Sequence, residues 1–161
     1  MKSITETPEF DSGKAWEIIA NLYFHKYRGW DIKPTTTRQE RVECRGDYIY
    51  TKPGVRDLYV EHKADFEALR TGNIFLETVS VDNANKKGWI YTSTADTVLY
   101  ALPFNHKVLV CSPQRLNGEI ESLRRQFREV PTYKNDGYIT RGLLVPIEYA
   151  IKNLVEQVIE I

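Results

Sequence analysis

The feature that most constrains the fold of this chain is a pair of strand-forming segments joined by a tight turn. Residues 47–51, Asp-Tyr-Ile-Tyr-Thr, are rich in side chains that favour β-structure. The sequence Lys52-Pro53-Gly54 is typical of a turn, and residues 55–64 alternate largely between polar and apolar side chains. We therefore predict an antiparallel hairpin over residues 47–64.

The second strand of this hairpin has two different faces, because successive side chains of a strand point to opposite sides of a sheet. One face is mostly apolar and suited to a core: it carries Leu58, Val60, His62 and Ala64. The other face is polar: it carries Asp57, Tyr59, Glu61, Lys63 and Asp65. The Cα atoms of Glu61 and Lys63 should be about 6.6 Å apart, at roughly 3.3 Å per residue, so both side chains can reach one phosphate and one metal ion. Alternating charges are also typical of a solvated edge strand, so the hypothesis of a site depends on a further carboxylate.

Asp47 supplies that carboxylate. It opens the first strand, 14 residues before Glu61, and a turn at Pro53-Gly54 brings it close to Glu61 in the pairing of the hairpin. The rival, Asp57, lies on the same strand as Glu61 and about 13 Å from it by strand rise, which is too far to share one metal ion. Mg²⁺ prefers oxygen ligands, and phosphodiester hydrolysis needs a metal, a positioned water and compensation of negative charge. Asp47, Glu61 and Lys63 together fit this chemistry.

The length and the charge of the chain limit its class. At 161 residues the chain is long enough for one domain with a substantial core, and we predict a single domain over residues 1–161. Lys and Arg number 22, and Asp and Glu also number 22, so binding of nucleic acid would need a local basic surface rather than bulk charge.

The sequence also carries no signal for several other classes. No apolar run approaches the ~20 residues that span a bilayer, and the N-terminus has no apolar signal core. We therefore expect a cytoplasmic protein that does not associate with a membrane. Cys44 and Cys111 are isolated, which favours reduced thiols over a disulfide or a metal site. No Walker loop, dinucleotide fingerprint or serine elbow is present, so we expect no nucleotide cofactor.

The remaining segments predict an α/β protein with one mixed sheet flanked by helices. Helical spacing and capping residues favour helices over residues 9–27, 92–102, 114–128 and from Pro146 to the C-terminus. Short strands are expected near Asp31, over 73–79, 107–111 and 138–145. Asp96 would lie near the start of the second helix, as a capping or positioning residue.

The motif Asp47…Glu61-x-Lys63 resembles the active-site signature of the PD-(D/E)XK nuclease superfamily, which has the restriction-endonuclease-like fold. A longer run resembles a small branch of this superfamily found in phages and other mobile elements; it comprises Tyr59-Val60-Glu61-His62-Lys63-Ala64-Asp65, Thr71-Gly72-Asn73-Ile74-Phe75-Leu76-Glu77, Gly88-Trp89-Ile90 and Thr94-Ala95-Asp96. The match covers roughly residues 45–112, and Gly142-Leu143-Leu144-Val145-Pro146 also fits. The chain departs from the signature at Gly46, where the signature has a proline.

The resemblance implies a fold, a reaction and a set of ligands. The fold would be a central mixed sheet with an αβββαβ core and a C-terminal α-β-α extension, and the activity that of a Mg²⁺-dependent endo- or exonuclease in which Mn²⁺ substitutes. Asp47 and Glu61 would bind the metal, with the carbonyl of His62 as a further ligand, while the His62 ring is expected in the core. Lys63 would orient or deprotonate the attacking water and offset charge on the phosphate. Many relatives add a glutamate on a helix; Glu17 is our candidate, and Glu77 on the next strand is the alternative.

The expected partner is DNA. Basic residues that could contact its phosphates, or could simply be solvated, are Lys86, Lys87, Arg124, Arg125, Lys134 and Arg141. The resemblance implies an endonuclease, either a site-specific mobile-element enzyme or a Holliday junction resolvase, that acts as a homodimer to cut both strands. The alternative, favoured by the neutral net charge, is a nuclease-like fold that binds DNA or another protein without catalysis.

Overall fold

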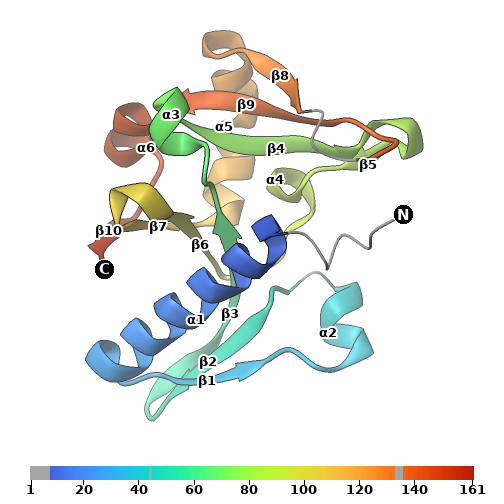
Figure 1. Ribbon diagram of the computed structural model, residues 1–161. Helices are drawn as coiled ribbons and strands as arrows, with labels where there is room; N and C mark the ends of the chain where they lie inside the picture. Colours follow the sequence, from blue (N-terminus) through green and yellow to red (C-terminus); the bar gives the residue numbers. More distant parts are fainter. Residues whose placement is uncertain (1–7, 44, 133–135) are drawn as a thin grey trace.

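A computed structural model describes residues 8–43, 45–132 and 136–161, with backbone alone at 8–11, 41 and 42. This part of the chain forms an α/β structure with two separate sheets (Figure 1). The helices are α1 Pro8–Arg28, α2 Arg38–Val42, α3 Ala68–Thr71, α4 Trp89–Thr92, α5 Pro113–Gln126 and α6 Ile147–Asn153, with 3₁₀ turns η2 Asp82–Ala84 and η3 Pro103–Asn105. The strands are β1 Asp31–Pro34, β2 Tyr48–Lys52, β3 Val55–Ala64, β4 Asn73–Val81, β5 Lys86–Lys87, β6 Thr97–Leu102, β7 Lys107–Cys111, β8 Glu129–Thr132, β9 Thr140–Pro146 and β10 Gln157–Glu160.

The predicted hairpin is confirmed as β2 and β3. The two strands pair antiparallel, with Tyr48 opposite Val60 and Tyr50 opposite Leu58. Together they occupy the second and third positions of a six-stranded sheet in the order β1-β2-β3-β6-β7-β10. Beside β3 runs β6, and this is the parallel pair of the sheet. Every other pairing in the sheet is antiparallel.

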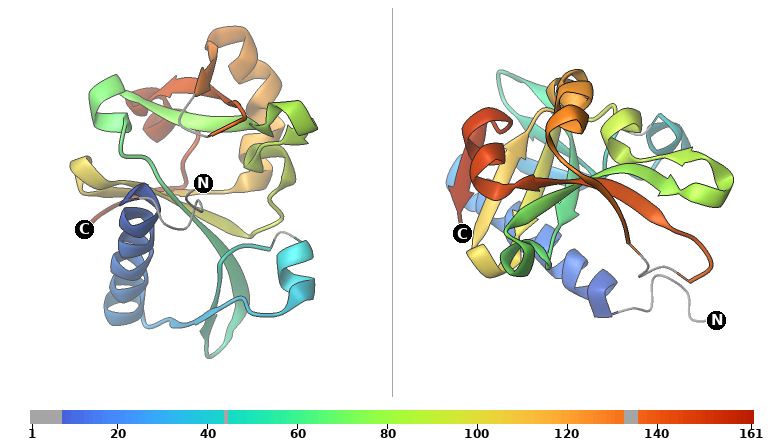
Figure 2. Two further views of the ribbon diagram at one scale, coloured as in Figure 1. Left: turned by 45° about the vertical axis from the view of Figure 1, so that its right-hand side comes forward. Right: turned by 90° about the horizontal axis from the view of Figure 1, so that it is seen from above.

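The prediction of one mixed sheet is wrong, because β4 does not join β3. It belongs to a four-stranded antiparallel sheet in the order β5-β4-β9-β8, which lies as a second layer over the first (Figures 1 and 2). The segment from Asp65 to Thr71 redirects the chain after β3: the Asp65 carboxylate accepts hydrogen bonds from the N–H of Glu67 and Phe75. The new direction carries β4 to β9, with Leu76 opposite Leu143.

Two predicted helices are wrong over part or all of their length. The helix expected over 92–102 is instead the short α4, a loop and strand β6. Residues of β6 alternate between two cores, since Val98 and Tyr100 join one apolar cluster while Leu99 and Ala101 join the other. The last helix ends at Asn153, and strand β10 follows it because pairing with β7 sets Val158 opposite Leu109. The predicted helices over 9–27 and 114–128, and the strands over 73–79, 107–111 and 138–145, are confirmed within a few residues.

The six-stranded sheet is covered over part of both faces. On one face, α1 packs Trp16, Tyr23 and Phe24 against the cluster that contains Tyr50 and Val60. On the other face, the second sheet with α4, α5 and α6 encloses the larger cluster, which includes Leu76, Leu123 and Leu143. The two faces of β3 therefore look towards different layers of the molecule.

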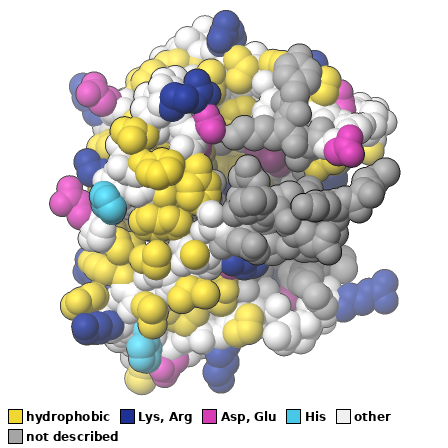
Figure 3. All heavy atoms as spheres, viewed as in Figure 1, with side chains coloured by type: hydrophobic (Ala, Val, Ile, Leu, Met, Phe, Trp, Pro, Cys, Tyr) yellow, Lys and Arg dark blue, Asp and Glu magenta, His cyan; other side chains and the backbone are white. Residues whose placement is uncertain are grey.

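The solvent side of α1 also carries apolar residues. Ile18 and Leu22 are 58% and 61% exposed, and Figure 3 shows hydrophobic side chains gathered along this side of the molecule. Among the helices that the structure describes, none combines the length and the apolar character that crossing a bilayer requires.

Candidate active site

Asp47 is held against the middle of β3. It lies in a bend directly before β2, and its N–H donates a hydrogen bond of 2.8 Å to the carbonyl of Val60. Its Oδ2 accepts a hydrogen bond of 2.8 Å from the N–H of His62. The carboxylate thus takes a position beside β3 that a backbone carbonyl of a paired strand would otherwise occupy. As a result, Asp47 contacts the residue that separates Glu61 from Lys63.

Gly46 makes this close approach possible. Its φ is +109°, in the region that favours glycine. A Cβ atom at this position would lie 2.6 Å from the carbonyl oxygen of Val60 and 3.0 Å from the amide nitrogen of Glu61. No side chain fits there without displacement of backbone, so the glycine lets the chain of Asp47 pack on β3.

Glu61 and Lys63 form an ion pair on one face of β3. Lys63 Nζ lies 2.7 Å from Glu61 Oε1, and the side chains are 34% and 14% exposed respectively. The second carboxylate oxygen of Glu61 accepts a hydrogen bond from Ser93 Oγ. In the parallel register Glu61 lies beside Val98 and Lys63 beside Tyr100, both part of the larger cluster. The pair therefore faces the second layer of the molecule.

The charges of three carboxylates act on the Lys63 ammonium and control its pKa. Burial alone would lower that pKa, but Glu61, Asp47 and Glu77 outweigh burial and raise the pKa above its usual value. Glu77 shows the opposite balance: burial raises the pKa of Glu77, although Lys63 and the N–H of Trp89 counteract the effect. The predicted alternative, Glu77, thus shares the electrostatic environment of Glu61 and Lys63.

Glu17 lies on the other face of the sheet. Its carboxylate, 14% exposed, pairs with Lys14 at 2.8 Å and accepts a hydrogen bond of 3.1 Å from the Tyr48 hydroxyl. Tyr48 packs with the cluster beneath α1. The structure therefore does not bring Glu17 to the Glu61–Lys63 pair. The charge of Asp47 contributes to raising the pKa of both Lys14 and Lys63. A catalytic role for Glu17 stays a prediction.

The His62 ring is buried beneath α1, as the apolar face of β3 predicts. Only 9% of the residue is exposed, and Nε2 lies 3.4 Å from the Tyr50 hydroxyl. Burial, and secondarily the charge of Lys14, lower the pKa of His62 to about 3. The imidazole is therefore neutral, and the part of His62 available to a metal ion is the backbone carbonyl.

The donor types at this site suit a hard cation. Asp47 and Glu61 supply two carboxylates, and Mg²⁺ commonly binds one or two carboxylates while it keeps several waters. In the described part of the chain, no group of three or more His, Cys, Asp or Glu residues is arranged to hold a metal ion. Within those residues, a cation would therefore depend on these two carboxylates, the His62 carbonyl and water.

Two of the predicted DNA-contacting residues are brought together around one aromatic ring. Lys87 Nζ and Arg124 Cζ lie 5.7 and 5.8 Å from the centroid of the Tyr91 ring. Arg124 also pairs with Glu129 at 3.3 Å, which offsets part of its charge. The segment that carries Lys87 and Tyr91 also carries Trp89, whose ring lies 6.0 Å from Lys63 Nζ. Trp89 itself is buried in the larger cluster, so the segment from Lys87 to Tyr91 links the basic surface at Tyr91 to the core beside Lys63.

The other predicted basic residues are not part of this surface contact. Lys86 on β5 and Arg125 on α5 are exposed. Arg141 is half-buried on β9, where it pairs with Pro131. Lys134 lies outside the described residues.

Ser93 contributes to the site although the sequence did not single it out for that role. Ser93 reaches Glu61 only because the chain runs from α4 into β6 in parallel register with β3. No local spacing encodes that neighbourhood. Asp96, expected on a helix, instead precedes β6 and accepts a hydrogen bond of 2.8 Å from the Tyr59 N–H.

Comparison of the chain with protein-family models, with curated proteins and with solved structures finds no match. The assignment of a function therefore depends on the geometry of the site and on the sequence motif.

Proposed function

We propose that this protein is a Mg²⁺-dependent deoxyribonuclease with a PD-(D/E)XK-type active site on a restriction-endonuclease-like fold. The observation that carries the proposal is the hydrogen bond from His62 N–H to Asp47 Oδ2. It brings Asp47 to the segment of β3 that bears the Glu61–Lys63 ion pair. Two carboxylates and an ammonium carried by neighbouring segments are the groups that metal-assisted phosphodiester hydrolysis requires.

Each residue has a role in this proposal. Asp47 and Glu61, with the carbonyl of His62, would hold the cation. When bound, the cation polarises the phosphate and lowers the pKa of the attacking water. Lys63 is protonated at neutral pH because its pKa is raised, so it would orient the water and offset charge on the phosphate rather than abstract a proton. Lys87 and Arg124 would contact the DNA backbone. Mn²⁺ would substitute for Mg²⁺ as the bound cation.

A homodimer is part of the proposal, because cleavage of both strands of a duplex is simplest with two active sites. The exposed apolar residues of α1, Ile18 and Leu22, supply an apolar surface of the kind that marks interaction sites. Sedimentation of the purified protein, alone and with Leu22→Glu, would measure the oligomeric state and the contribution of this helix.

Cleavage of supercoiled plasmid and of four-way junction DNA with Mg²⁺ or Mn²⁺ tests the activity. We expect nicked or linear products from the wild type and a loss of at least about 100-fold in Glu61→Gln and Lys63→Ala, the scale of a lost charge-stabilising group at an active site. Glu160→Gln and Lys33→Ala are matched controls, since both residues are exposed on edge strands of the same sheet. Preference for the junction would favour a resolvase, and sequence-dependent cutting of plasmid a site-specific endonuclease. Unchanged cleavage in both active-site variants would contradict the proposal.

A second candidate is a DNA-binding or protein-interaction module without turnover. One observation favours it: both carboxylate oxygens of Glu61 already have partners, Lys63 and Ser93. Under this alternative, the wild type would bind DNA with equal affinity with and without divalent ions and would cleave no substrate.

A further inference from the structure

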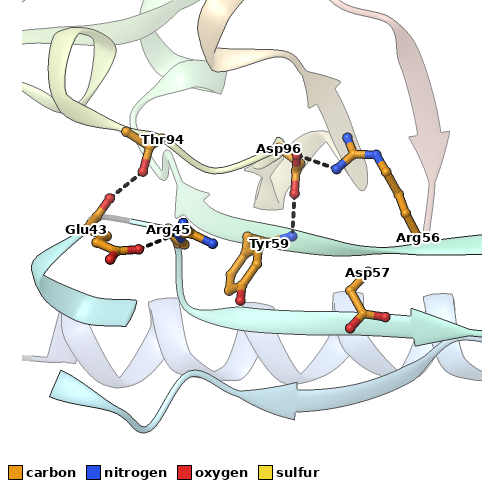
Figure 4. A pocket seen from close by; sticks show the side chains of 7 residues that line it. All are labelled: Glu43, Arg45, Arg56, Asp57, Tyr59, Thr94 and Asp96. Carbon is orange, nitrogen blue, oxygen red and sulfur yellow. Dashed lines mark hydrogen bonds and ion pairs between the residues drawn. The ribbon is translucent and has the colours of Figure 1, made fainter. Parts of the chain in front are cut away.

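An open pocket of about 510 Å³ lies on the same side of β3 as Glu61 (Figure 4). Its lining residues are Glu43, Arg45, Arg56, Asp57, Tyr59, Thr94 and Asp96. The ring of Tyr59 forms part of the wall, and the guanidinium of Arg45 lies 5.1 Å from the centroid of that ring. The roles given above to the candidate catalytic residues make no use of this pocket.

Two segments of the chain, strand β3 and the residues just before β2, each contribute to both the pocket and the candidate active site. On β3, Tyr59 lines the pocket and Glu61 lies in the site, two residues further and on the same face, about 6.6 Å away by strand rise. Before β2, Arg45 lines the pocket and Asp47 lies in the site.

The loop before β6 is a third segment that contributes to both the site and the pocket. Ser93 bonds to Glu61, and its neighbour Thr94 lines the pocket. Thr94 also donates a hydrogen bond to the carbonyl of Glu43, which joins two segments of the pocket wall. The pocket therefore lies beside the site, towards the N-terminal end of β3.

The charges of the pocket disfavour a phosphate. Arg45 pairs with Glu43 at 2.6 Å, and Arg56 pairs with Asp96 at 2.9 Å. Both arginines are thus neutralised within the pocket, which leaves the exposed carboxylate of Asp57 as the remaining charge. A phosphate would meet net negative charge here, whereas a neutral ring that bears an amino group would meet a hydrogen-bond acceptor.

The walls are suited to a flat aromatic ligand. Bases of single-stranded nucleic acids stack on tyrosine rings and on guanidinium planes, and Arg45 with Tyr59 supplies both. The wall is also fixed in position, because the Asp96 carboxylate accepts hydrogen bonds from both the Tyr59 N–H and Arg56. Asp57 can accept from the exocyclic amino group of a base, as Asp and Glu do with cytosine.

We propose that this pocket binds one unpaired nucleobase of a DNA strand whose neighbouring phosphate is held at Asp47, Glu61 and Lys63. This inference deepens the proposed nuclease function and rests on it for the position of the phosphate. It predicts that DNA with unpaired nucleotides, such as single strands, flaps or branched structures, is bound in preference to continuous duplex.

Fluorescence anisotropy without divalent ions tests the pocket independently of catalysis. The probes are a single-stranded oligonucleotide, the same strand with every base replaced by an abasic residue, and the blunt duplex of the same sequence. The single strand and its abasic form carry the same phosphates, so their affinity ratio isolates the bases. We expect the wild type to bind the natural single strand about tenfold more tightly than either other probe, the scale of one base–aromatic stack.

Two variants should remove most of this ratio. Tyr59→Leu deletes the ring, and Arg45→Gln removes the guanidinium from an exposed position, which keeps the test valid if the strand variant folds poorly. Tyr27→Leu is the matched control, because Tyr27 is a surface tyrosine on α1 with 65% exposure. Asp57→Asn should weaken binding of oligo-dC several-fold relative to oligo-dT.

The outcomes separate this inference from the nuclease proposal. Equal affinity of the wild type for the natural and the abasic strand, or an unchanged ratio in both Tyr59→Leu and Arg45→Gln, would overturn the pocket inference. Cleavage by the wild type that survives Glu61→Gln would overturn the nuclease proposal instead, while a base-dependent ratio that needs Tyr59 would still support the pocket.

Discussion

Oδ2 of Asp47 accepts a 2.8 Å hydrogen bond from the backbone N–H of His62, the residue between Glu61 and Lys63. This contact has both a structural and a chemical consequence. It satisfies the backbone donor of His62, and under the proposed function it holds a carboxylate beside the strand that bears Glu61 and Lys63.

The two consequences can be separated by the choice of substitution at Asp47. Asp47→Ala leaves the His62 N–H without its partner and should lower the free energy of unfolding by about 1–3 kcal/mol. Asp47→Asn keeps an acceptor oxygen but loses the charge, so its stability should stay within about 1 kcal/mol of the wild type while cleavage is lost. Urea unfolding of both variants makes the comparison, and equal destabilisation by the two changes would contradict this role of the carboxylate.

Gly46 should tolerate substitution less well than a glycine with similar backbone strain and free space. Gly46→Ala adds a Cβ atom 2.6 Å from the Val60 carbonyl at a φ of +109°, and we expect a loss of about 2–5 kcal/mol. Gly54→Ala is the control, because Gly54 has a φ of +75° but no atom within 4 Å of the added Cβ. It should cost only about 1–2 kcal/mol. Equal losses in urea unfolding would show that the contact with β3 contributes little.

The stability of the protein should fall in mild acid because of His62. The unfolded imidazole binds a proton near pH 6.5, whereas burial lowers the pKa of the folded His62 to about 3. The unfolded state therefore binds more protons between these pH values. The contribution of the neutral, buried His62 to the free energy of unfolding is complete above pH 6.5 and declines as the pH falls. The loss should be about 2 kcal/mol between pH 6.5 and 5. Urea unfolding measured across this pH range should show that the free energy of unfolding depends less on pH in His62→Leu than in the wild type. An identical pH dependence in both proteins would contradict the assignment to His62.

Lys87 and Arg124 should contribute to DNA affinity through charge rather than through sequence recognition. Each lies within 6 Å of the Tyr91 ring centroid, on the side of the molecule next to Lys63 and Trp89. Lys87→Ala and Arg124→Ala should each weaken binding to all sequences and lower the slope of log affinity against log salt by about one. Lys152→Ala, on the exposed side of α6, is the control. Salt titrations by anisotropy measure the slope, and a control variant with the same loss would contradict a localised DNA surface.

The hairpin could be predicted from sequence because it depends on local signals. A turn at Pro53-Gly54 and the period-two alternation of β3 determine the register, and the register brings Asp47 to the backbone of Val60 and His62. The burial of the His62 ring followed from the same alternation.

The second sheet, strand β6 and the environment of Glu61 depend on contacts between distant segments. β4 pairs with β9, about 70 residues later in the chain, and the sequence of β6 is apolar on both faces, so its period does not distinguish a strand from a helix. Ser93 reaches Glu61 only through the parallel pairing of β3 with β6. The pocket beside Tyr59 has the same origin, since three separate segments form its walls.

Calorimetric titration with Mn²⁺ tests the central claim most directly, because the claim is that Asp47 and Glu61 belong to one cation site. The wild type and the matched controls Asp31→Asn and Glu160→Gln should each bind one ion per active site. Asp47→Asn and Glu61→Gln should each lower the affinity for Mn²⁺ at least about tenfold. The double variant should have about the affinity of the weaker-binding single variant, because the effects of two ligands of one ion are not additive. Binding that is absent in the wild type, or unaffected by both substitutions, would contradict the account.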